Sequence, residues 1–497
     1  MKLRKNPHIY EINLMTWLEA LSRREQRKID LRSIPLREWR DLKALGMDLV
    51  WLMGMWHRSP DSRRRARAEP QLVKACGNIL EDFNIEDIVG SAYAVHDYRP
   101  DPAFGSLEDL RTLKATLEDE GLQLVLDFVP NHTACDHPWI TQYPERYVLG
   151  EKKGEAACEE GYFLAGRSPD QNCFAHGKDP YFPPWTDTAQ INYGQDKTME
   201  AMSETILHLS EHCHGFRCDM AMLILKDVFV QTWGQRLGGK IAEREFWSFA
   251  IEKLRSAGRS NILIAEAYWG KDASLISHGF DYAYDKHLYD LMGRGDVRGM
   301  KDALSAPVPS QEKMVRFLEN HDEERAIMLF GSGKIRCAMI IQATIPGMRF
   351  WHHGQWDGHR LHIPVQLRRA PDEASDSDLR AFSERLLKEI NHPVFHEGLF
   401  KMCHTHGWSD NNSHVNLLAW SWEKGDHRRL IIVNFSSEPA QGYITLSKGL
   451  LPMSKHLVFL DPIKKESYQR DFAEVENTGL YSGLESGDFH FFIIEKG

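Results

Sequence analysis

The amino-acid sequence predicts an α/β fold, a (β/α)8 TIM barrel, from two observations. Eight short apolar runs recur over the first 354 residues, and longer segments with apolar residues three and four positions apart separate them. Strands that alternate with helices form parallel βαβ units, and eight such units close into a barrel. Since 497 residues exceed what one hydrophobic core usually supports, we expect further domains beside the barrel.

The eight runs are rich in Val, Ile, Leu, Met and aromatic residues, as the buried strands of a parallel sheet are. Residues 106–121 and 198–213 are examples of the helical segments between them. In chain order the expected strands are residues 8–17, 48–56, 122–130, 214–222, 261–269, 280–285, 314–322 and 347–354.

Two stretches depart from this alternation. After the third strand, the chain is rich in Gly, Pro, Asp and aromatic residues with little periodicity, which indicates a loop-rich insertion. From residue 394, short alternating strands with polar turns indicate an all-β domain, a β-sandwich. The expected units are a catalytic barrel of residues 1–132 and 196–393, an inserted subdomain of 133–195 and a C-terminal domain of 394–497.

The composition argues against several classes of function. A formal net charge of −10 is unsuited to nucleic-acid binding, which needs cations to neutralise phosphates. The first residues contain no apolar core of a signal peptide, and no apolar run approaches the ~18 residues of a membrane span. We therefore expect a cytoplasmic protein with neither nucleic acid nor membrane as a partner.

The eight cysteines include no CxxC pair and do not resemble a disulfide framework. "HCHGFRC" (212–218) and "CHTH" (403–406) contain residues that can bind zinc. The first lies on a predicted strand, and the second has no other ligand cluster nearby, so ordinary side chains are the better interpretation. No metal site is predicted from these residues.

Polar side chains follow several predicted strands where the strands end. The carboxyl ends of barrel strands converge on one mouth, which is where such barrels carry their chemistry. A single Asp in this position is usually a helix cap. Carboxylates, histidines and an arginine gathered at one rim are harder to explain in this way. They are Asp127, Asn131, His132, Arg217, Asp219, Glu266, Asn320, His321 and Asp322.

One charged pair lies within the apolar run of the fourth strand. Arg217 and Asp219 are two residues apart, so in a strand both side chains point to the same side. Burying charges is expensive unless they are paired and used. A neighbouring positive charge lowers the pKa of a carboxyl group, so this pair is suited to keep Asp219 ionised in a partly dry site.

Four segments carry a resemblance to a known family. They are "DFVPNH" (127–132), "GFRCD" (215–219), "IAEAYW" (264–269) and "FLENHD" (317–322). In order and spacing they resemble the four motifs of the α-amylase family of retaining glycosidases, glycoside hydrolase family 13. Each motif is weak alone, whereas the ordered set is specific. The resemblance extends over most of the chain, including the insertion and the β domain.

The resemblance implies a role for each matching residue. Asp219 would be the nucleophile that forms a covalent glycosyl-enzyme, and Glu266 would be the general acid and base. Asp322 would bind sugar hydroxyl groups more tightly in the transition state. His132 and His321 would donate further hydrogen bonds to the same ring.

Aromatic residues could provide further contacts with a sugar. "SAYAVHDY" (91–98) resembles the family's segment after the second strand, in which a tyrosine, here Tyr93, stacks on the bound ring. A half-buried core tyrosine is the alternative interpretation. Four tryptophans in strand-end loops or in the insertion are weaker candidates for outer subsites: Trp56, Trp139, Trp185 and Trp269.

The sequence departs from the calcium-dependent members of the family. Apolar residues, "MAMLIL" (220–225), stand where many members carry a Lys-His pair. Gln190 in "TAQIN" stands where an aspartate usually helps to hold calcium, although Asn131 matches a calcium ligand. One recognisable ligand is too few for a tight site, so we expect no cofactor and no structural calcium.

Three functions remain open. The favoured one is hydrolysis of α-glucosidic bonds in malto-oligosaccharides or α-glucans. A transglycosylase or isomerase would use the same intermediate and pass the sugar to another acceptor. A non-catalytic binding or assembly subunit is disfavoured, because such proteins usually lose the carboxylates and this chain retains Asp219, Glu266 and Asp322.

Overall fold

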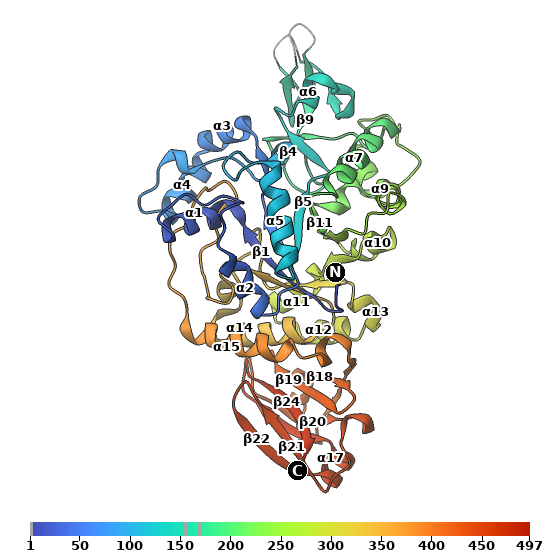
Figure 1. Ribbon diagram of the computed structural model, residues 1–497. Coiled ribbons are helices and arrows are strands. Elements are labelled where there is room, and N and C mark those ends of the chain that lie inside the picture. The colour runs from blue at the N-terminus through green and yellow to red at the C-terminus, as the bar shows by residue number, and fades with distance from the viewer. Residues whose placement is uncertain (1–2, 154–156, 167–170) are drawn as a thin grey trace.

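The computed structural model describes residues 3–153, 157–166 and 171–497. It contains a closed barrel of eight parallel strands, which confirms the predicted fold class. Around the barrel the strand order is β1-β15-β14-β13-β12-β11-β5-β2, and β2 pairs with β1 to close it. The inserted segment lies at one end of the barrel and the C-terminal β domain at the other (Figure 1).

All eight expected runs contain a barrel strand, although the strands are shorter than the runs. The first run divides, because helix α1 begins at Leu14 directly after strand β1. The strands are β1 (His8–Asn13), β2 (Leu49–Met53), β5 (Gln123–Phe128), β11 (Gly215–Cys218), β12 (Ile262–Ala265), β13 (Tyr282–Tyr284), β14 (Met314–Arg316) and β15 (Met348–His352).

Helices surround the barrel and place their apolar faces against it. Several begin at side-chain caps, such as Ser106 at α5 and Asp376 at α15. The helices of the barrel and its loops are α1 (Leu14–Arg24), α2 (Leu36–Ala44), α3 (Pro60–Ala68), α4 (Pro70–Ile79), α5 (Leu107–Asp119), α7 (Asp196–Leu209), α8 (Lys226–Trp233), α9 (Phe246–Ser256), α10 (Asp272–Ser277), α11 (Lys286–Arg294), α12 (Val297–Leu304), α13 (Val308–Gln311), α14 (Ala326–Thr344), α15 (Ser377–Ile390) and α16 (Val394–Glu397).

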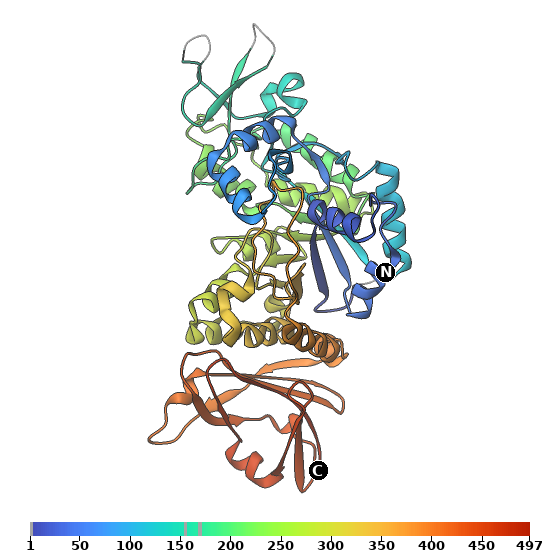
Figure 2. The same ribbon diagram turned by 90° about the vertical axis from the view of Figure 1, so that its left-hand side faces the viewer.

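Two long excursions meet over one side of the barrel mouth. The chain between β2 and β5 contains two antiparallel paired strands, β3 (Trp56–Arg58) and β4 (Val95–Pro100), with α3 and α4 in the connection between them. This pair of strands is called the hairpin of β3 and β4 below. The segment between β15 and α15, orange in Figure 2, reaches this excursion. A β-bridge joins Ile88 to Leu367, and Arg369 forms ion pairs with Asp87 and Asp82. Because β1 lies between β2 and β15, these contacts join the segments that follow its two neighbours in the barrel.

The insertion after the third barrel strand consists of small antiparallel sheets. β6 (His132–Ala134) pairs with β10 (Thr188–Gln190), and β7 (Leu149–Gly150) and β8 (Tyr162–Ala165) both pair with β9 (Asn172–Ala175). The segment also contains α6 (Trp139–Gln142). In the β6–β10 register, Gln190 lies opposite His132. The insertion therefore begins and ends at neighbouring positions beside the barrel.

A disulfide joins Cys158 to Cys173 in this insertion, whereas the other six cysteines are free. This bond was not expected from the cysteine spacing, since no single pairing can be deduced from isolated cysteines. Disulfides are typical of oxidising compartments. The cytoplasmic location therefore stays a prediction, and this disulfide is an argument against it.

The C-terminal domain packs a six-stranded antiparallel sheet, β16-β18-β19-β24-β21-β22, against a three-stranded sheet, β17-β20-β23. Trp420 and Trp422 donate their indole N–H groups to Thr344, which joins this domain to α14. Its elements are β16 (Leu399–Met402), β17 (His404–His406), β18 (Leu417–Lys424), β19 (His427–Asn434), β20 (Ala440–Thr445), β21 (His456–Asp461), β22 (Glu466–Asp471), α17 (Phe472–Thr478), β23 (Leu480–Leu484) and β24 (Phe489–Lys496).

Helix α14 has the length and the apolar composition that a membrane span needs, which the sequence analysis did not anticipate. Length and composition alone do not distinguish such a span from a buried core helix, and 61% of the relevant window is buried inside the protein. Non-helical backbone at Gly331 also interrupts α14. The packing of α14 between the barrel and the β domain accounts for its apolar sequence.

Candidate active site

Arg217 lies at the centre of the polar residues in the barrel mouth. Strand β11 places it beside Asp127 of β5 in the parallel register, and its side chain is 1% exposed. Its guanidinium carbon lies 5.1 Å from the ring centroid of Trp51 and 5.2 Å from that of Tyr93. Two aromatic faces thus hold the guanidinium by cation–π contacts and orient it toward the carboxylates.

The same guanidinium binds two carboxyl groups. Arg217 Nη1 donates a hydrogen bond to Asp219 Oδ1 at 2.6 Å, and Nη2 forms an ion pair with Glu266 Oε2 at 2.7 Å. The expected pair of Arg217 and Asp219 is therefore present. Glu266 joins it from the end of β12, although it lies 47 residues further along the chain than Asp219. One buried cation thus fixes two carboxyl groups on the same side of the mouth.

The backbone after Asp219 also positions Glu266. Met220 adopts a left-handed conformation with φ 42° and ψ 44°, which is uncommon for a residue with a side chain. In this conformation its N–H group donates to Glu266 Oε2 at 2.6 Å. The Tyr268 hydroxyl donates to Glu266 Oε1 at 3.0 Å. Strained backbone is frequent at sites where it serves a function.

Burial raises the pKa of both carboxyl groups, and the pKa of Glu266 stays the higher of the two. Burial raises the pKa of Asp219 to about 6, although the Arg217 charge and its hydrogen bond oppose this shift. Burial also raises the pKa of Glu266 to about 7; Arg217 opposes this shift, and the negative charges of Asp219 and Asp322 add to it. Near neutral pH the first group is mostly ionised and the second retains a proton for part of the time. A general acid must hold a proton that the nucleophile has lost, and the order of these two pKa values is compatible with that division of roles.

Asp127, the first residue of the first motif, lies beside Arg217 on the neighbouring strand, with 3.7 Å between Asp127 Oδ1 and Arg217 Nη1. Gly54, directly after β2, donates its N–H group to Asp127 Oδ2 at 2.9 Å. The backbone of Gly54 has φ 76°, which glycine adopts without strain. Burial raises the pKa of Asp127 to about 6, against the opposing charge of Arg217. Asp127 therefore belongs to the same electrostatic cluster as the two carboxyl groups above it.

Asp322 and His321 form the other side of the candidate site. His321 Nε2 lies 2.9 Å from Asp322 Oδ2, and the Asp322 side chain is 48% exposed at the mouth. Although burial opposes a charge on His321, the carboxylates of Asp322 and Glu11 raise its pKa well above the usual value. Desolvation alone would raise the pKa of Asp322. The positive charge of His321 outweighs this effect and lowers the pKa of Asp322 to about 2.

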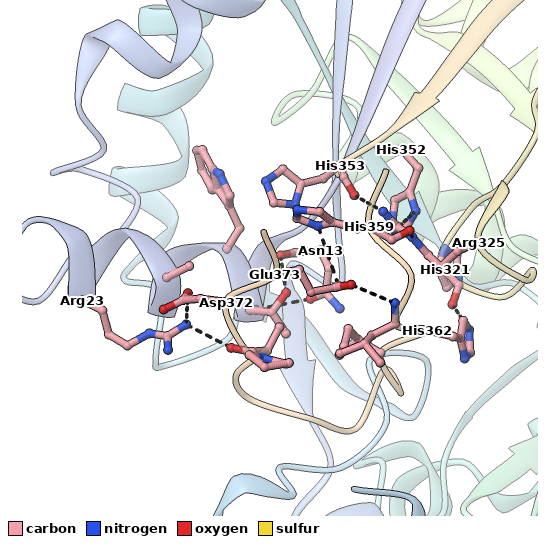
Figure 3. A pocket seen from close by; sticks show the side chains of 17 residues that line it. Asn13, Arg23, His321, Arg325, His352, His353, His359, His362, Asp372 and Glu373 are labelled. Carbon is pink, nitrogen blue, oxygen red and sulfur yellow. Dashed lines mark hydrogen bonds and ion pairs between the residues drawn. The ribbon is translucent and has the colours of Figure 1, made fainter. Parts of the chain in front are cut away.

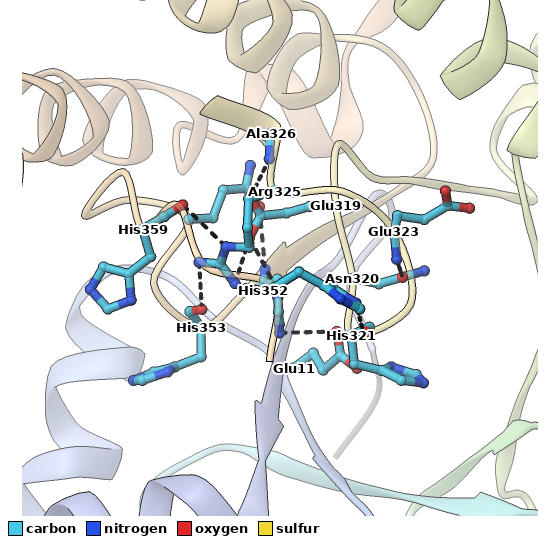
Figure 4. Close-up of polar contacts among 12 residues, drawn as sticks. Glu11, Glu319, Asn320, His321, Glu323, Arg325, Ala326, His352, His353 and His359 are labelled. Atoms are coloured by element: carbon cyan, nitrogen blue, oxygen red, sulfur yellow. Dashed lines mark hydrogen bonds and ion pairs between the residues drawn. The ribbon is translucent and has the colours of Figure 1, made fainter. Parts of the chain in front are cut away.

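A buried network that the sequence analysis missed lies behind His321 (Figure 4). Glu11 Oε1 is 2.5 Å from His321 Nδ1, and Glu11 Oε2 is 3.8 Å from His352 Nε2. Arg325 Nη1 donates to His352 Nδ1 at 2.8 Å and forms an ion pair with Glu319 at 3.1 Å. In the sequence, Glu11 lies in an apolar strand as Arg217 does, which is the signal that could have identified it.

Tyr93 and His132 lie where they can contribute to the site, in different ways. The Tyr93 ring stacks on His321 with centroids 5.2 Å apart, and its hydroxyl lies 2.7 Å from His321 Nε2. His132 is buried, and burial lowers its pKa to about 4. Its ring contacts that of Trp185, with centroids 5.3 Å apart. Tyr93 therefore joins the centre around Arg217 and His321, while His132 lies at the base of the insertion.

The family model described as "Alpha amylase, catalytic domain" matches residues 39–363, about two thirds of the chain. The matched range includes Asp219, Glu266 and Asp322 with the strands that position them. The chain belongs to the α-amylase family. This confirms the family inferred from the four motifs, and with it membership of a family of glycoside hydrolases.

Curated α-amylase relatives are distant from this chain. It is 24% identical over 307 residues to α-amylase 3 of Dictyoglomus thermophilum, over 57% of each chain. It is 22% identical over 316 residues to an α-glucosidase of Culex pipiens, over 56% of this chain and 53% of the relative. The matches thus span a little more than half the length of these relatives.

A solved α-amylase structure supports the fold over nearly the full length. The maltogenic α-amylase AmyB of Thermotoga neapolitana superposes with a TM-score of 0.68 and 17% identity, covering 98% of both chains. At this identity the likeness concerns the fold alone. It agrees with an α-amylase arrangement of barrel, insertion and C-terminal β domain.

The α-amylase calcium position does not fit a cation in this chain. Gln190 is buried, and its amide Nε2 lies 3.0 Å from both the carbonyl oxygen and the side-chain Oδ1 of Asn131. A third contact joins Nε2 to the carbonyl oxygen of Ile191 at 3.1 Å. An N–H donor thus satisfies the oxygen atoms that a calcium ion would need as ligands.

The four tryptophans proposed for outer subsites differ in exposure. Trp56 is 1% exposed and donates its indole N–H to the carbonyl oxygen of Asp127, so it supports the site and cannot line a subsite. Trp139 and Trp185 are partly buried in the insertion. Trp269 is 39% exposed and faces Tyr181 edge-on, with centroids 4.8 Å apart. Trp269 is the tryptophan of this set that presents most surface.

A cavity of about 250 Å³ adjoins the site through His321. Figure 3 shows five histidines around it, His321, His352, His353, His359 and His362. Its other walls come from α1 and from the segment after β15. His362 Nε2 lies 2.8 Å from the carbonyl oxygen of His321, so this segment is joined directly to the fourth motif.

Proposed function

We propose that this protein is a retaining α-glycosidase that hydrolyses α-glucosidic bonds in malto-oligosaccharides or α-glucans. The observation that carries the proposal is the sharing of Arg217 by Asp219 and Glu266, at 2.6 and 2.7 Å. The shared cation keeps the two carboxyl groups close, and their pKa values differ in the direction that a nucleophile and an acid require. A pair about 5 to 5.5 Å apart is typical of retaining enzymes.

In the proposed first step, an Asp219 oxygen forms a bond to the anomeric carbon while the bond to the leaving oxygen breaks. Glu266 transfers its proton to that oxygen, so the departing sugar leaves as a neutral alcohol. In the second step, a water molecule attacks the anomeric carbon, Glu266 takes one of its protons, and Asp219 leaves as a carboxylate. Two displacements return the α-configuration.

Asp322 supports both steps from the opposite side of the mouth. Its pKa of about 2 keeps it ionised, and it can accept hydrogen bonds from sugar hydroxyl groups as positive charge develops on the ring. His321, positively charged, and Tyr93 stand beside it. This arrangement gives the reacting ring a polar wall at Asp322 and an aromatic surface at Tyr93.

The contacts over β1 favour short chains or chain ends as substrates. Leu367 bridges to Ile88, and Arg369 binds Asp87, which joins the segments after β2 and β15 on one side of the mouth. A long chain that passes through an open cleft needs both ends of the cleft free. We infer that the enzyme removes small sugars from an end of the chain and does not cleave at random inside a polymer.

A transglycosylase or isomerase remains the second candidate, since the same covalent intermediate can react with a sugar hydroxyl in place of water. The Glu266 side chain is only 2% exposed. A site with little water slows hydrolysis of the intermediate, which favours this second candidate. A non-catalytic assembly subunit is disfavoured, because each carboxyl group has the partners that its proposed role needs.

The test is incubation of the purified protein with maltose, isomaltose, trehalose and maltoheptaose, with products resolved by chromatography. We expect glucose or short products from the α-1,4 substrates, and NMR of the first product should show the α-anomer. A β-anomer as first product would contradict the retaining mechanism. Added sugar acceptor separates the two candidates, because a transglycosylase would form longer or rearranged sugars. Lack of turnover on all four substrates would contradict the proposed hydrolysis.

A further inference from the structure

Outside the candidate active site, the hairpin of β3 and β4 brings together side chains that can bind metal. His57, His96 and Asp97 each offer one ligand atom, and these atoms all lie within 4.8 Å of one another. His57 Nδ1 is 3.5 Å from Asp97 Oδ2, and the His57 and His96 rings are 5.1 Å apart. Ligand atoms of one tetrahedral zinc ion lie about 3.4 Å apart, because each is about 2.0 to 2.2 Å from the metal. The His57–Asp97 separation fits this geometry, and side-chain rotation would bring the remaining ligand atom to the same distance.

An irregularity in the hairpin creates this cluster. His57 pairs with Asp97 and the next residue, Arg58, pairs with Val95, so His96 is an extra residue on β4. In a regular strand, His96 and Asp97 would point to opposite faces. A β-bulge re-aims a side chain, and bulges are usually features with a purpose and not defects. The backbone therefore directs three ligand types to one point.

Surrounding groups resemble the second shell of a metal site. His96 Nδ1 lies 3.4 Å from Asp136 Oδ1. Asp136 is itself held by hydrogen bonds from the Ser59 hydroxyl at 2.6 Å and the Asp61 N–H at 3.1 Å. A fixed carboxylate beside a metal-binding imidazole orients its ring and increases its basicity.

We propose that His57, His96 and Asp97 bind a divalent cation of the zinc type, with water completing the coordination. Two imidazoles and one carboxylate are ligands that zinc accepts, and calcium would require oxygen atoms throughout. Side chains at the cluster are about a quarter exposed or less, at 25% for His57 and 19% for Asp97, so an ion can enter from solvent. The site is separate from Arg217, Asp219 and Glu266.

Arg99 is the competitor that such an ion must overcome. It binds both oxygens of Asp97, at 3.1 and 2.6 Å, and its own side chain is 76% exposed. Exposed ion pairs contribute little free energy, so a divalent ion can displace or share this contact. Removal of the arginine should therefore tighten metal binding.

Metal binding here would act on the hairpin whose strand β4 begins two residues after Tyr93. Tyr93 lies three residues before His96, and Asp136 lies at the beginning of the insertion. An ion at the hairpin would join β3 to β4 and, through the contact of His96 with Asp136, hold the insertion. The expected effect is a more stable hairpin, with the Tyr93 platform fixed beside His321.

The experiment is titration of the metal-free full chain with Zn2+ by calorimetry and with Co2+ by visible absorption. We expect one ion per chain in the micromolar range or tighter, a four-coordinate Co2+ spectrum, and a rise in Tm on adding zinc. His57→Gln and His96→Gln should each weaken binding at least about tenfold, since even the loss of an outer-shell partner of a ligand costs that much. Arg99→Ala should strengthen it.

His404→Gln is the matched control, because His404 lies on β17 near His406, with rings 6.1 Å apart, in a different domain. It should leave zinc binding unchanged. Zinc binding that survives in His57→Gln and His96→Gln, or that His404→Gln abolishes, would place the ion elsewhere and overturn the proposal. If a histidine variant does not fold, Asp97→Asn and Arg99→Ala give the same decision, by a loss and a gain of affinity.

Discussion

Glu11 Oε1 lies 2.5 Å from His321 Nδ1, and both side chains are buried within the barrel. The first barrel strand thus supplies a carboxylate to the histidine that pairs with Asp322 in the fourth motif. Glu11 also faces His352, its neighbour across the β1–β15 register. A chain of contacts from Glu11 through His321 therefore fixes Asp322 at the mouth, without Glu11 itself reaching the substrate.

Glu11→Gln should weaken catalysis without unfolding the protein. The substitution removes a negative charge that holds the proton on His321, so the pKa of His321 should fall and that of Asp322 should rise. Loss of a charge-assisted hydrogen bond costs about 2 kcal/mol, which corresponds to roughly a 30-fold decrease in kcat/KM. Kinetics on maltose with circular dichroism would measure both properties.

Glu118→Gln is the matched control for this prediction. Glu118 Oε1 lies 2.6 Å from His214 Nε2, in an ion pair just before the beginning of β11, at the end of the barrel opposite the mouth. Its loss should change kcat/KM by less than about twofold, as expected for an exposed pair. Equal activity of Glu11→Gln and the native protein would show that Glu11 has no positioning role.

The barrel and the central residues of the site were accessible from the sequence for physical reasons. Strands buried on both faces are apolar throughout, which made eight short runs recognisable. A charge inside such a run has a high cost, so Arg217 and Asp219 were conspicuous. Glu266 and Asp322 needed the additional fact that the carboxyl ends of all barrel strands meet at one mouth.

Other parts depended on long-range packing that a sequence does not display. The pair of Cys158 and Cys173 forms only because the insertion folds into a small sheet. Likewise, Leu367 lies in a segment without periodicity, and its bridge to Ile88 joins loops 279 residues apart. Trp56 was misjudged since its position after a strand did not reveal that its side chain turns inward.

The rate of hydrolysis should have a narrow maximum between about pH 6 and pH 7. Below this range Asp219, whose pKa is about 6, gains a proton and cannot attack. Above it Glu266, whose pKa is about 7, loses the proton that the leaving group needs. The two groups are close and titrate together, so the limbs report the pair. A profile of kcat/KM against pH on maltose would test this, and a flat profile from pH 5 to about pH 9 would contradict it.

Asp322→Asn should move the alkaline limb of this profile. The negative charge of Asp322 adds to the raised pKa of Glu266, so its removal should lower that pKa. We expect a shift toward acid, together with a large loss of rate. Activated glucosides with a good leaving group would keep the residual rate measurable. An unchanged limb would mean that Asp322 is not electrostatically coupled to Glu266.

Calcium should not stabilise this protein. Gln190 Nε2 already donates to both oxygens of Asn131, so a cation would have to displace a buried amide. Addition of millimolar calcium to the metal-free chain should change Tm by less than about 1 °C, because ligands stabilise only in proportion to their binding. Zinc, which acts through a different site, provides the positive comparison. A rise of many degrees with calcium would show that Gln190 does not replace the ion.

Gln190→Asp offers the reciprocal test. The new carboxylate would lack the N–H donors that now satisfy Asn131, and an unsatisfied buried polar group costs about 1–3 kcal/mol. We expect Tm to fall by a few degrees in the metal-free variant and to recover with calcium. Recovery would identify residue 190 as the position that decides calcium dependence; no recovery would mean that further ligands are missing.

The two steps of the proposed reaction can be separated at Glu266. Its acid role matters when the leaving group is a sugar alcohol, whereas fluoride or nitrophenolate departs without a proton. Glu266→Gln retains a hydrogen-bond acceptor for the Met220 N–H and should still fold. Activity on maltose should fall far more than the first step on activated α-glucosides.

The second step in Glu266→Gln still lacks its base, so the glycosyl-enzyme on Asp219 should accumulate as a mass increase of one sugar. Azide attacks without losing a proton and should restore turnover, with release of the α-glucosyl azide, because the second displacement inverts the β-linked intermediate. Asp219→Ala is the control that cannot form this intermediate, and azide should not restore the same α-product. If azide has no effect on Glu266→Gln and all substrates lose activity equally, then Glu266 serves only to hold Arg217 and the Met220 backbone, and the acid must be another group in the mouth.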